Sequence, residues 1–285
     1  MTAFLFPGQG SQKKGMGQGL FDSVPQYRSV EAEVDALLGY SMRALCLEDA
    51  DNRLKDTQYT QPALYVANAL HYYQAVNDGQ QPTHVAGHSL GEYNALLAAG
   101  VFDFLTGLKL VQKRGALMAE ARGGGMAAII GVEGAKIPQL LADNQLTTID
   151  VANYNSPVQT VITGPSDDIK KAQPIVEQAG AKLFVPLQVS GAFHSRYMAD
   201  AGKSFDNFLG GFAFNAPSIP VVANVTGEPY PAEQPTATVR ALLVKQITGS
   251  VQWTQSVRYL LTQGVTDFKE MGPGNVLTKL MKQIK

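Results

Sequence analysis

The sequence of 285 residues has little charge, a single cysteine and no long apolar run. Charged residues make up only 16% of the chain, and 23 Lys and Arg nearly balance 24 Asp and Glu. There is therefore no basic excess to neutralise a phosphate backbone, and nucleic acid is not an expected partner. No run of apolar residues reaches the roughly 18 that a membrane-spanning helix needs, so no membrane association is expected.

The one cysteine, Cys46, cannot form an internal disulfide and has no metal-ligand spacing around it. We interpret it as a small buried apolar side chain in a protein of a reducing compartment, which predicts a cytoplasmic location. No metal and no other cofactor is predicted. The length alone allows one large α/β domain or two smaller ones.

Short apolar runs that end at Gly or Ser alternate with longer amphipathic stretches. This pattern is typical of strands and helices in an α/β protein whose sheet is buried on both faces. The predicted strands are 3–6, 83–86, 220–224 and 266–270. The predicted helices between them include 61–76, 91–99 and 104–122.

The middle of the chain has a different order of elements. After three consecutive glycines at 123–125, the sequence predicts a strand, a helix, two strands, a helix and a strand. This order is the ferredoxin-like arrangement. We therefore predict a small subdomain at about residues 124–189, inserted into a larger one formed by 1–123 and 190–285.

The pentapeptide GHSLG directly follows a predicted strand and opens a predicted helix, with Ser89 at its centre. A sharp strand-to-helix turn exposes the serine hydroxyl, and the helix N-terminus offers backbone amides to an oxyanion. The context indicates a nucleophile elbow. The alternative is an ordinary Gly-rich turn with a serine that caps the helix, and the five residues alone do not separate the two.

A nucleophilic serine needs a base, and the sequence offers four histidines. His71 lies in a predicted helix and His84 in a predicted strand, where packing or surface roles are expected. The side chain of His88 should point away from the adjacent Ser89. His194 follows a strand and a turn, which is where α/β folds place catalytic side chains. We predict that His194 is the general base, and a helix-capping histidine is the alternative.

The segment FPGQGSQ is a Gly-rich loop after the first predicted strand. It has neither the GxxxxGK[ST] nor the GxGxxG spacing, so a nucleotide site is poorly supported. Adjacent strands of one sheet bring their C-terminal loops together. The backbone amides of Gln9 and Leu90 could therefore form an oxyanion hole.

Seven segments occur in the order seen in malonyl-CoA:acyl-carrier-protein transacylases and in the acyltransferase domains of polyketide synthases. They are FPGQGSQ, GHSLGEYNALLAAG, KRGALM, ANYNSP, GAFHS, VQWT and GPGNVLTKLM. The chain resembles this family from residue 6 to residue 281. The resemblance implies an α/β-hydrolase-like large subdomain that carries a ferredoxin-like small one, with the active site in the cleft between them.

The resemblance also implies an activity. Family members transfer a malonyl group from malonyl-CoA to the phosphopantetheine thiol of an acyl carrier protein, or of the carrier domain of a synthase. By position, the nucleophile corresponds to Ser89, the base to His194 and the oxyanion amides to Gln9 and Leu90. In this family a backbone carbonyl orients the histidine, and we assign that position to Gln252 in VQWT.

Three further residues are implied to bind substrate. Arg114 of KRGALM would bind the free carboxylate of malonyl, because a planar guanidinium can bind a carboxylate through two parallel hydrogen bonds. Without the resemblance, an exposed arginine on a long helix is the favoured interpretation. Met118 lies in the same segment. Phe193 resembles the residue of malonyl-loading polyketide acyltransferases, where methylmalonyl-loading ones usually have serine, and it should fill the space of an α-methyl branch.

The predicted function is a ping-pong malonyl transfer through an ester on Ser89. Bacterial fatty-acid transacylases often carry serine before the histidine, so Phe193 favours a free-standing acyltransferase that serves a polyketide synthase. One alternative is the malonyl transacylase of fatty-acid synthesis, and another is an acyl hydrolase that clears acyl groups from carrier proteins. Arg114 favours transfer, since a hydrolase of neutral chains would desolvate a cation for no gain. A non-catalytic docking module would not need both Ser89 and His194.

Overall fold

The structure is a computed structural model that describes residues 1–285. In chain order its elements are β1 (Thr2–Phe6), α1 (Leu20–Ser23), α2 (Pro25–Arg28), α3 (Glu31–Leu38), α4 (Met42–Leu47), η1 (Arg53–Lys55), α5 (Thr57–Asn77), β2 (His84–Gly87), α6 (Gly91–Ala98), α7 (Phe104–Ala119), β3 (Gly124–Ile130), η2 (Gly134–Lys136), α8 (Ile137–Asp143), β4 (Asp150–Ser156), β5 (Gln159–Pro165), α9 (Ser166–Gln178), β6 (Leu183–Pro186), η3 (Arg196–Met198), α10 (Ala199–Leu209), β7 (Val221–Val222), α11 (Pro235–Thr248), α12 (Trp253–Thr262), β8 (Asp267–Glu270) and α13 (Val276–Ile284). The three η elements are short 3₁₀ helices. The chain is thus a mixed α/β protein, as predicted.

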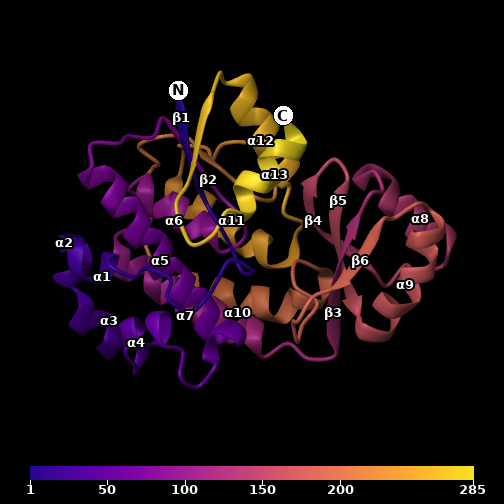
Figure 1. Ribbon diagram of the computed structural model, residues 1–285, viewed down its shortest axis with the longest axis horizontal. Coiled ribbons are helices and arrows are strands. Elements are labelled where there is room, and N and C mark those ends of the chain that lie inside the picture. The colour runs from indigo at the N-terminus through magenta and orange to yellow at the C-terminus, as the bar shows by residue number, and fades with distance from the viewer.

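One sheet has four parallel strands in the order β7-β2-β1-β8. Alternate residues of β1 enter two different apolar clusters, with Phe4 and Phe6 on one face and Ala3 and Leu5 on the other. Helices α5, α6 and α7 cover the first face, and α12 and α13 cover the second (Figure 1). All four predicted strands are present, although the third is reduced to β7.

The second sheet has the strand order β4-β5-β3-β6, and every neighbouring pair is antiparallel. Helices α8 and α9 pack on one face over an apolar cluster drawn entirely from residues 127–176. The other face contributes Met126, Ala128 and Val161 to the main core. In Figure 1 this sheet and its two helices lie beside the part that holds the parallel sheet.

Strand β4 joins the two parts. Asn153 forms an isolated parallel bridge with Val251, and the amide of Tyr154 donates to the carbonyl of Val251 at 2.9 Å. The hydroxyl of Thr254 donates to the carbonyl of Tyr154 at 3.0 Å. These bonds fix the antiparallel sheet to the start of α12.

Helix α5 begins at Thr57, four residues before its predicted start, so Pro62 lies inside the helix. A residue that precedes proline is biased away from the helical region, which made the earlier turn hard to predict. Two tertiary features override that bias. The hydroxyl of Thr60 donates to the carbonyls of Leu54 and Asp56 at the helix start, and α7 packs closely on this turn. No helix of the chain combines the length and the apolar character needed to cross a membrane.

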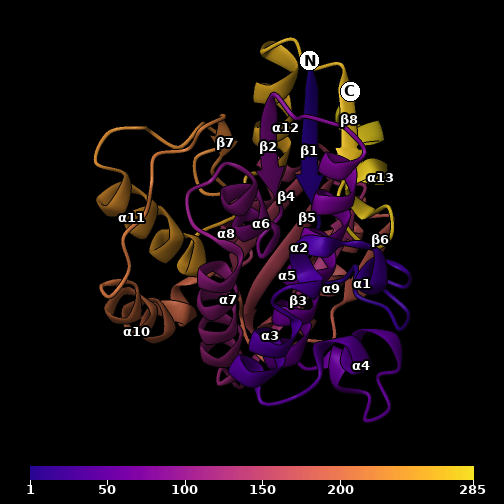
Figure 2. The same ribbon diagram turned by 90° about the vertical axis from the view of Figure 1, so that its left-hand side faces the viewer.

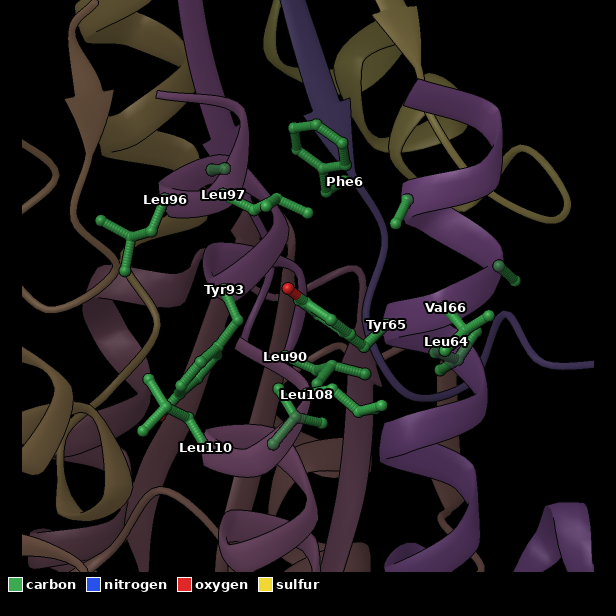
Figure 3. Packing of buried hydrophobic residues seen from close by; sticks show 14 of the residues in the cluster. Phe6, Leu64, Tyr65, Val66, Leu90, Tyr93, Leu96, Leu97, Leu108 and Leu110 are labelled. Carbon is green, nitrogen blue, oxygen red and sulfur yellow. The ribbon is translucent and has the colours of Figure 1, made fainter. Parts of the chain in front are cut away.

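The helices behind β2 pack around the turn that follows this strand. Figure 3 shows Leu90 and Tyr93 at the start of α6 beside Tyr65 of α5 and Leu108 of α7. All four side chains are buried, and the hydroxyl of Tyr65 donates to the carbonyl of Phe104 at 3.1 Å. The turn between β2 and α6 is therefore held in place by its packing on α5 and α7. On the other side, α11 packs on α10, which lies next to α7 (Figure 2).

Candidate active site

Ser89 occupies the turn between β2 and α6 in a left-handed conformation, with φ of +50°. This conformation is uncommon for a residue other than glycine. The flanking positions have no room for a side chain. A β-carbon on Gly91 would lie 2.0 Å from the carbonyl oxygen of Phe6, and one on Gly87 would lie 1.9 Å from the carbonyl of Gly91. A strained serine between two such glycines, at a strand-to-helix turn, is the geometry of a nucleophile elbow.

His194 lies against this serine. Its Nε2 is 2.8 Å from Ser89 Oγ, and its Nδ1 is 2.8 Å from the carbonyl oxygen of Gln246. A carbonyl only accepts hydrogen bonds, so Nδ1 carries the proton and Nε2 presents its lone pair to the serine hydroxyl. Burial, and secondly the nearby Arg114 cation, lower the pKa of His194 to about 3. The imidazole is therefore neutral near pH 7 and free to accept a proton.

The carbonyl that orients His194 belongs to Gln246, and the sequence-based assignment to Gln252 is wrong. Gln246 lies in the last turn of α11, where helix carbonyls lack intrahelical partners and are free to accept other donors. Gln252 precedes α12, and its carbonyl accepts from the amide and the hydroxyl of Ser256 instead.

The amides of Gln9 and Leu90 are both available. Neither donates a hydrogen bond within the protein, and both residues line the cavity beside Ser89. The loops that carry them approach closely, since a β-carbon on Gly8 would lie 2.4 Å from the carbonyl oxygen of His88. Two free amides in adjacent loops can bind an oxyanion.

Arg114 of α7 is a buried cation that faces the nucleophile. Its side chain is 1% exposed, and Nη2 donates to Ser89 Oγ at 3.1 Å and to Gln246 Oε1 at 3.0 Å. Nη1 donates to Gln61 Oε1 at 2.8 Å, and the guanidinium lies 5.6 Å from the ring centre of Tyr93. None of the ion pairs of the protein includes Arg114. A buried cation without a carboxylate partner is costly, so the site is suited to an anionic ligand.

A cavity of about 90 Å³ lies over Ser89 and His194. Met118 and Phe193 both line it, together with Arg114. Phe193 is buried, and its ring packs so closely on Gly191, two residues earlier, that a β-carbon there would lie 2.8 Å from it.

Several residues that hold the site were missed by the sequence analysis. Asn224 is one: its Oδ1 accepts from the amide of Ser89, and its Nδ2 donates to the carbonyl of Gly87, both at 2.6 Å. Its place at the end of the predicted strand 220–224 was an available signal, because polar side chains at the carboxyl ends of parallel strands gather at functional sites.

Two glutamines were missed as well. Gln61 and Gln246 both accept hydrogen bonds from Arg114, but each lies in a helical segment without a distinguishing pattern. His88, by contrast, behaves as predicted. Its side chain turns away from Ser89, and its Nε2 lies 2.8 Å from Asn155 Oδ1 in the ANYNSP segment.

Sequence comparison identifies close relatives. The acyl transferase domain family matches residues 3–283. The polyketide biosynthesis malonyl CoA-acyl carrier protein transacylase BaeC of Bacillus velezensis is 51% identical, over 100% of this chain and 97% of BaeC. The malonyl CoA-acyl carrier protein transacylase of Escherichia coli is 42% identical, over 99% and 92%. The polyketide biosynthesis protein ThaF of Burkholderia thailandensis is 53% identical, but the chain spans only 24% of its length.

Solved structures with a similar fold are malonyl transacylases as well. The malonyl CoA-acyl carrier protein transacylase of Burkholderia pseudomallei has a TM-score of 0.93 at 46% identity, covering 100% of this chain and 97% of that one. A malonyl-transacylase solved in complex with its type II polyketide synthase acyl-carrier protein has a TM-score of 0.92 at 38% identity, covering 99% and 92%. With a family match over nearly its whole length and the same mixed α/β fold, the chain belongs to the acyl transferase domain family.

Proposed function

We propose that this protein transfers a malonyl group from malonyl-CoA to the phosphopantetheine thiol of an acyl carrier protein, or of a carrier domain of a synthase, through an ester on Ser89. One observation carries the proposal: Arg114 is buried, lacks a carboxylate partner and lies 3.1 Å from Ser89 Oγ. Malonyl differs from acetyl by one carboxylate, which this guanidinium can bind through two charge-assisted hydrogen bonds. The names of BaeC and of the Escherichia coli relative support the same activity.

In the first half-reaction, His194 Nε2 accepts the hydroxyl proton as Ser89 Oγ attacks the thioester carbonyl. The amides of Gln9 and Leu90 bind the oxyanion of the tetrahedral intermediate. When the intermediate collapses, the carbon–sulfur bond breaks and His194 gives its proton to the thiolate of coenzyme A. In the second half-reaction, the carrier thiol gives its proton to His194 and attacks the ester carbonyl; the bond from this carbon to Ser89 Oγ then breaks, and His194 returns the proton to Ser89 Oγ.

The orienting group of His194 is neutral in this mechanism. The carbonyl of Gln246 accepts from Nδ1 and stabilises the imidazolium that forms transiently. We propose no role for a metal or another cofactor. The reaction exchanges one thioester for another, so its overall free-energy change is small. The base must therefore return the proton that it accepts in each half-reaction.

Selectivity for the acyl group is proposed to come from two sides of the cavity. Arg114 binds the carboxylate, while Phe193 and Met118 fill the space beside the α-carbon. An α-methyl branch would have to displace one of these packed side chains, which favours malonyl over methylmalonyl.

We also propose a division into two subdomains. Residues 1–123 and 190–285 would form an α/β-hydrolase-like catalytic subdomain, and 124–189 a ferredoxin-like one. The support is that all strands of the parallel sheet come from the first two segments and all strands of the antiparallel sheet from the third. The antiparallel part also has its own apolar cluster. The cavity has lining residues from both, with Ser89 on one side and Met126 on the other.

A polyketide context is favoured over fatty-acid synthesis. Relatives named for polyketide biosynthesis that this chain covers almost fully include BaeC at 51% identity and PksC of Bacillus subtilis at 49%, compared with 42% for the Escherichia coli transacylase. Phe193 agrees with that assignment. Cys46 is buried and free, which is compatible with the proposed cytoplasmic location.

Intact-protein mass measurement tests the proposal. Wild-type protein incubated with malonyl-CoA should gain the mass of one malonyl group, and Ser89→Ala should gain none while keeping its thermal unfolding midpoint. Malonyl labelling of Ser89→Ala at another residue would refute the nucleophile. Adding a carrier protein in its phosphopantetheine form should then move the label to the carrier thiol. Release of free malonate without a labelled carrier would favour the hydrolase instead.

A further inference from the structure

Glu92, in the first turn of α6, is a buried carboxylate that the proposed reaction does not use. Its side chain is 1% exposed and makes no ion pair. Oε1 accepts from the amide of Asn224 at 3.1 Å and from the hydroxyl of Tyr230 at 2.6 Å. Oε2 accepts from Nε2 of Gln246. A buried carboxylate so fully bonded, directly behind the nucleophile, calls for a physical explanation.

Gln246 connects this carboxylate to the site. Its Nε2 also donates to the carbonyl of Ser89 at 2.8 Å, and its Oε1 accepts from Arg114 Nη2 at 3.0 Å. Its backbone carbonyl accepts from His194. One residue thus contacts the nucleophile, the base and the cation, and Glu92 is the carboxylate that contacts it.

We propose that Glu92 is a positioning residue that fixes the side-chain amide of Gln246, and through it holds Arg114 in place for the malonyl carboxylate. This inference rests on the proposed function. The reason lies in donors and acceptors. An ionised carboxylate only accepts and a guanidinium only donates, so an amide between them has one satisfied orientation. Turning the amide over would set two acceptors face to face at Glu92 and two donors face to face at Arg114.

The indirect link from Glu92 through Gln246 to Arg114 also explains how a buried cation can stay available to the substrate. A carboxylate bonded directly to Arg114 would occupy the groups that the substrate needs. A carboxylate one amide away instead lowers the cost of burying the cation and leaves Nε, which has no partner within the protein, available to the substrate. Coulombic attraction to Arg114 is among the influences that lower the pKa of Glu92, which agrees with this placement.

Protonation of Glu92 should break the link. Burial raises its pKa to about 7, against hydrogen bonds from Tyr230, Asn224 and Gln246 that favour the ionised form. Protonation removes the negative charge of Glu92, and a proton on Oε2 would point an O–H donor at the amide NH₂ of Gln246, so the contact that orients Arg114 is disrupted. Malonyl transfer should therefore be retained above the pKa of Glu92 and fall as the pH drops below it.

The other titratable groups that face Glu92 do not change charge in this range. Burial raises the pKa of Tyr93 and of Tyr230, so both stay neutral. The Arg114 guanidinium stays charged. His194, beyond Gln246, has a pKa lowered to about 3 and is already neutral.

The test compares kcat/KM for malonyl-CoA and acetyl-CoA between about pH 5.5 and 8.5, the range in which a group with a pKa near 7 titrates. The wild type should lose malonyl transfer on the acid side with a midpoint near 7, and acetyl transfer should lack that loss. Glu92→Gln should lower malonyl transfer by about 10- to 100-fold at high pH and abolish its acid limb. Acetyl transfer should change by less than about threefold, because the backbone carbonyl that orients His194 remains.

Tyr230→Phe provides a second, milder variant. It removes one donor that favours ionised Glu92 but leaves Gln246 untouched. Its acid limb should move to higher pH while its high-pH malonyl rate stays near wild type. Glu228→Gln, an exposed carboxylate two residues away, is the matched control and should change neither substrate.

Equal losses of malonyl and acetyl transfer in Glu92→Gln would overturn the inference. The inference would also be overturned if Tyr230→Phe did not change the pH at which malonyl transfer is lost. This second result decides the question even if Glu92→Gln does not fold. Failure of the proposed function is seen separately, because wild-type protein would then acquire no malonyl group on Ser89 in the mass measurement.

Discussion

Replacing Arg114 with alanine separates recognition of the acyl group from support of the fold. The side chain donates to Gln61 Oε1, Ser89 Oγ and Gln246 Oε1. Truncation leaves two buried amide oxygens without a donor, at about 1–3 kcal/mol each. It also removes an unpaired cation from the interior, which is stabilising. Because these effects on the free energy of unfolding oppose each other, we expect Arg114→Ala to fold.

The effect on catalysis should depend on the substrate. Loss of one partner of a buried, hydrogen-bonded charge pair costs about 2–5 kcal/mol, which corresponds to roughly 30- to 4000-fold in kcat/KM for malonyl-CoA. Acetyl-CoA brings no carboxylate, so the wild-type site leaves Arg114 buried without a partner when acetyl is bound. Acetyl transfer should hold steady or rise in the variant.

The measurement is kcat/KM for both thioesters in wild type, Arg114→Ala and Lys109→Ala. Lys109 lies on the exposed side of the same helix, so its removal controls for changes in α7 that do not involve the site. The malonyl-to-acetyl ratio should collapse in Arg114→Ala and stay unchanged in Lys109→Ala. Equal losses on both substrates would show that Arg114 supports the structure only. No residue would then be identified that binds the malonyl carboxylate.

Three further outcomes are expected. His194→Ala should slow malonyl loading of Ser89 by about 10² or more, the contribution of one general base, and a single-turnover change below about tenfold would make His194 structural. Phe193→Ser should admit methylmalonyl-CoA by shifting selectivity by about 1–3 kcal/mol, and an unaltered malonyl preference in competition assays would contradict its place in the pocket. Because the pKa of His194 is lowered from 6.5 to about 3, its contribution to stability is fully present above 6.5 and is lost as the pH falls through 3. His194→Gln should therefore lose less stability on acidification in urea titrations, and parallel losses would contradict the lowered pKa.

Local signals account for the parts of the fold that were predictable. Apolar runs that end at or next to a glycine mark β1 and β2, so both strands were found to within a residue of their ends. The start of α5 was missed because its first turn depends on contacts from distant segments. Thr57 to Gln61 lie against Gly115 of α7, at a separation that no local pattern encodes.

The site divides in the same way. Ser89, His194 and Arg114 carry reactive or charged groups in recognisable segments, and the structure brings all three within hydrogen-bond reach. Gln246 acts on His194 through its backbone carbonyl, which every residue type has, so its identity gives no signal and the nearby Gln252 was chosen instead. Glu92 meets Tyr230 across 138 residues of sequence, and only the fold shows that pairing.

Burial of Glu92 and Arg114 next to the nucleophile lowers the stability of the fold but provides selectivity for the acyl group. The pKa of Glu92 is raised from 4.5 to about 7, so the stability it contributes is fully present below 4.5 and is lost as the pH rises through 7. The ionised form that orients Arg114 is thus the form that the folded protein disfavours. Apolar side chains of similar volume at Glu92 and Arg114 would relieve that cost, because a buried charge without an ion-pair partner is costly. They would also remove the cation that distinguishes malonyl from acetyl, because recognition of one carboxylate requires a cation kept unpaired until substrate arrives. Orienting His194 with the carbonyl of Gln246 keeps a third buried charge, which would compete with the substrate for Arg114, out of the site.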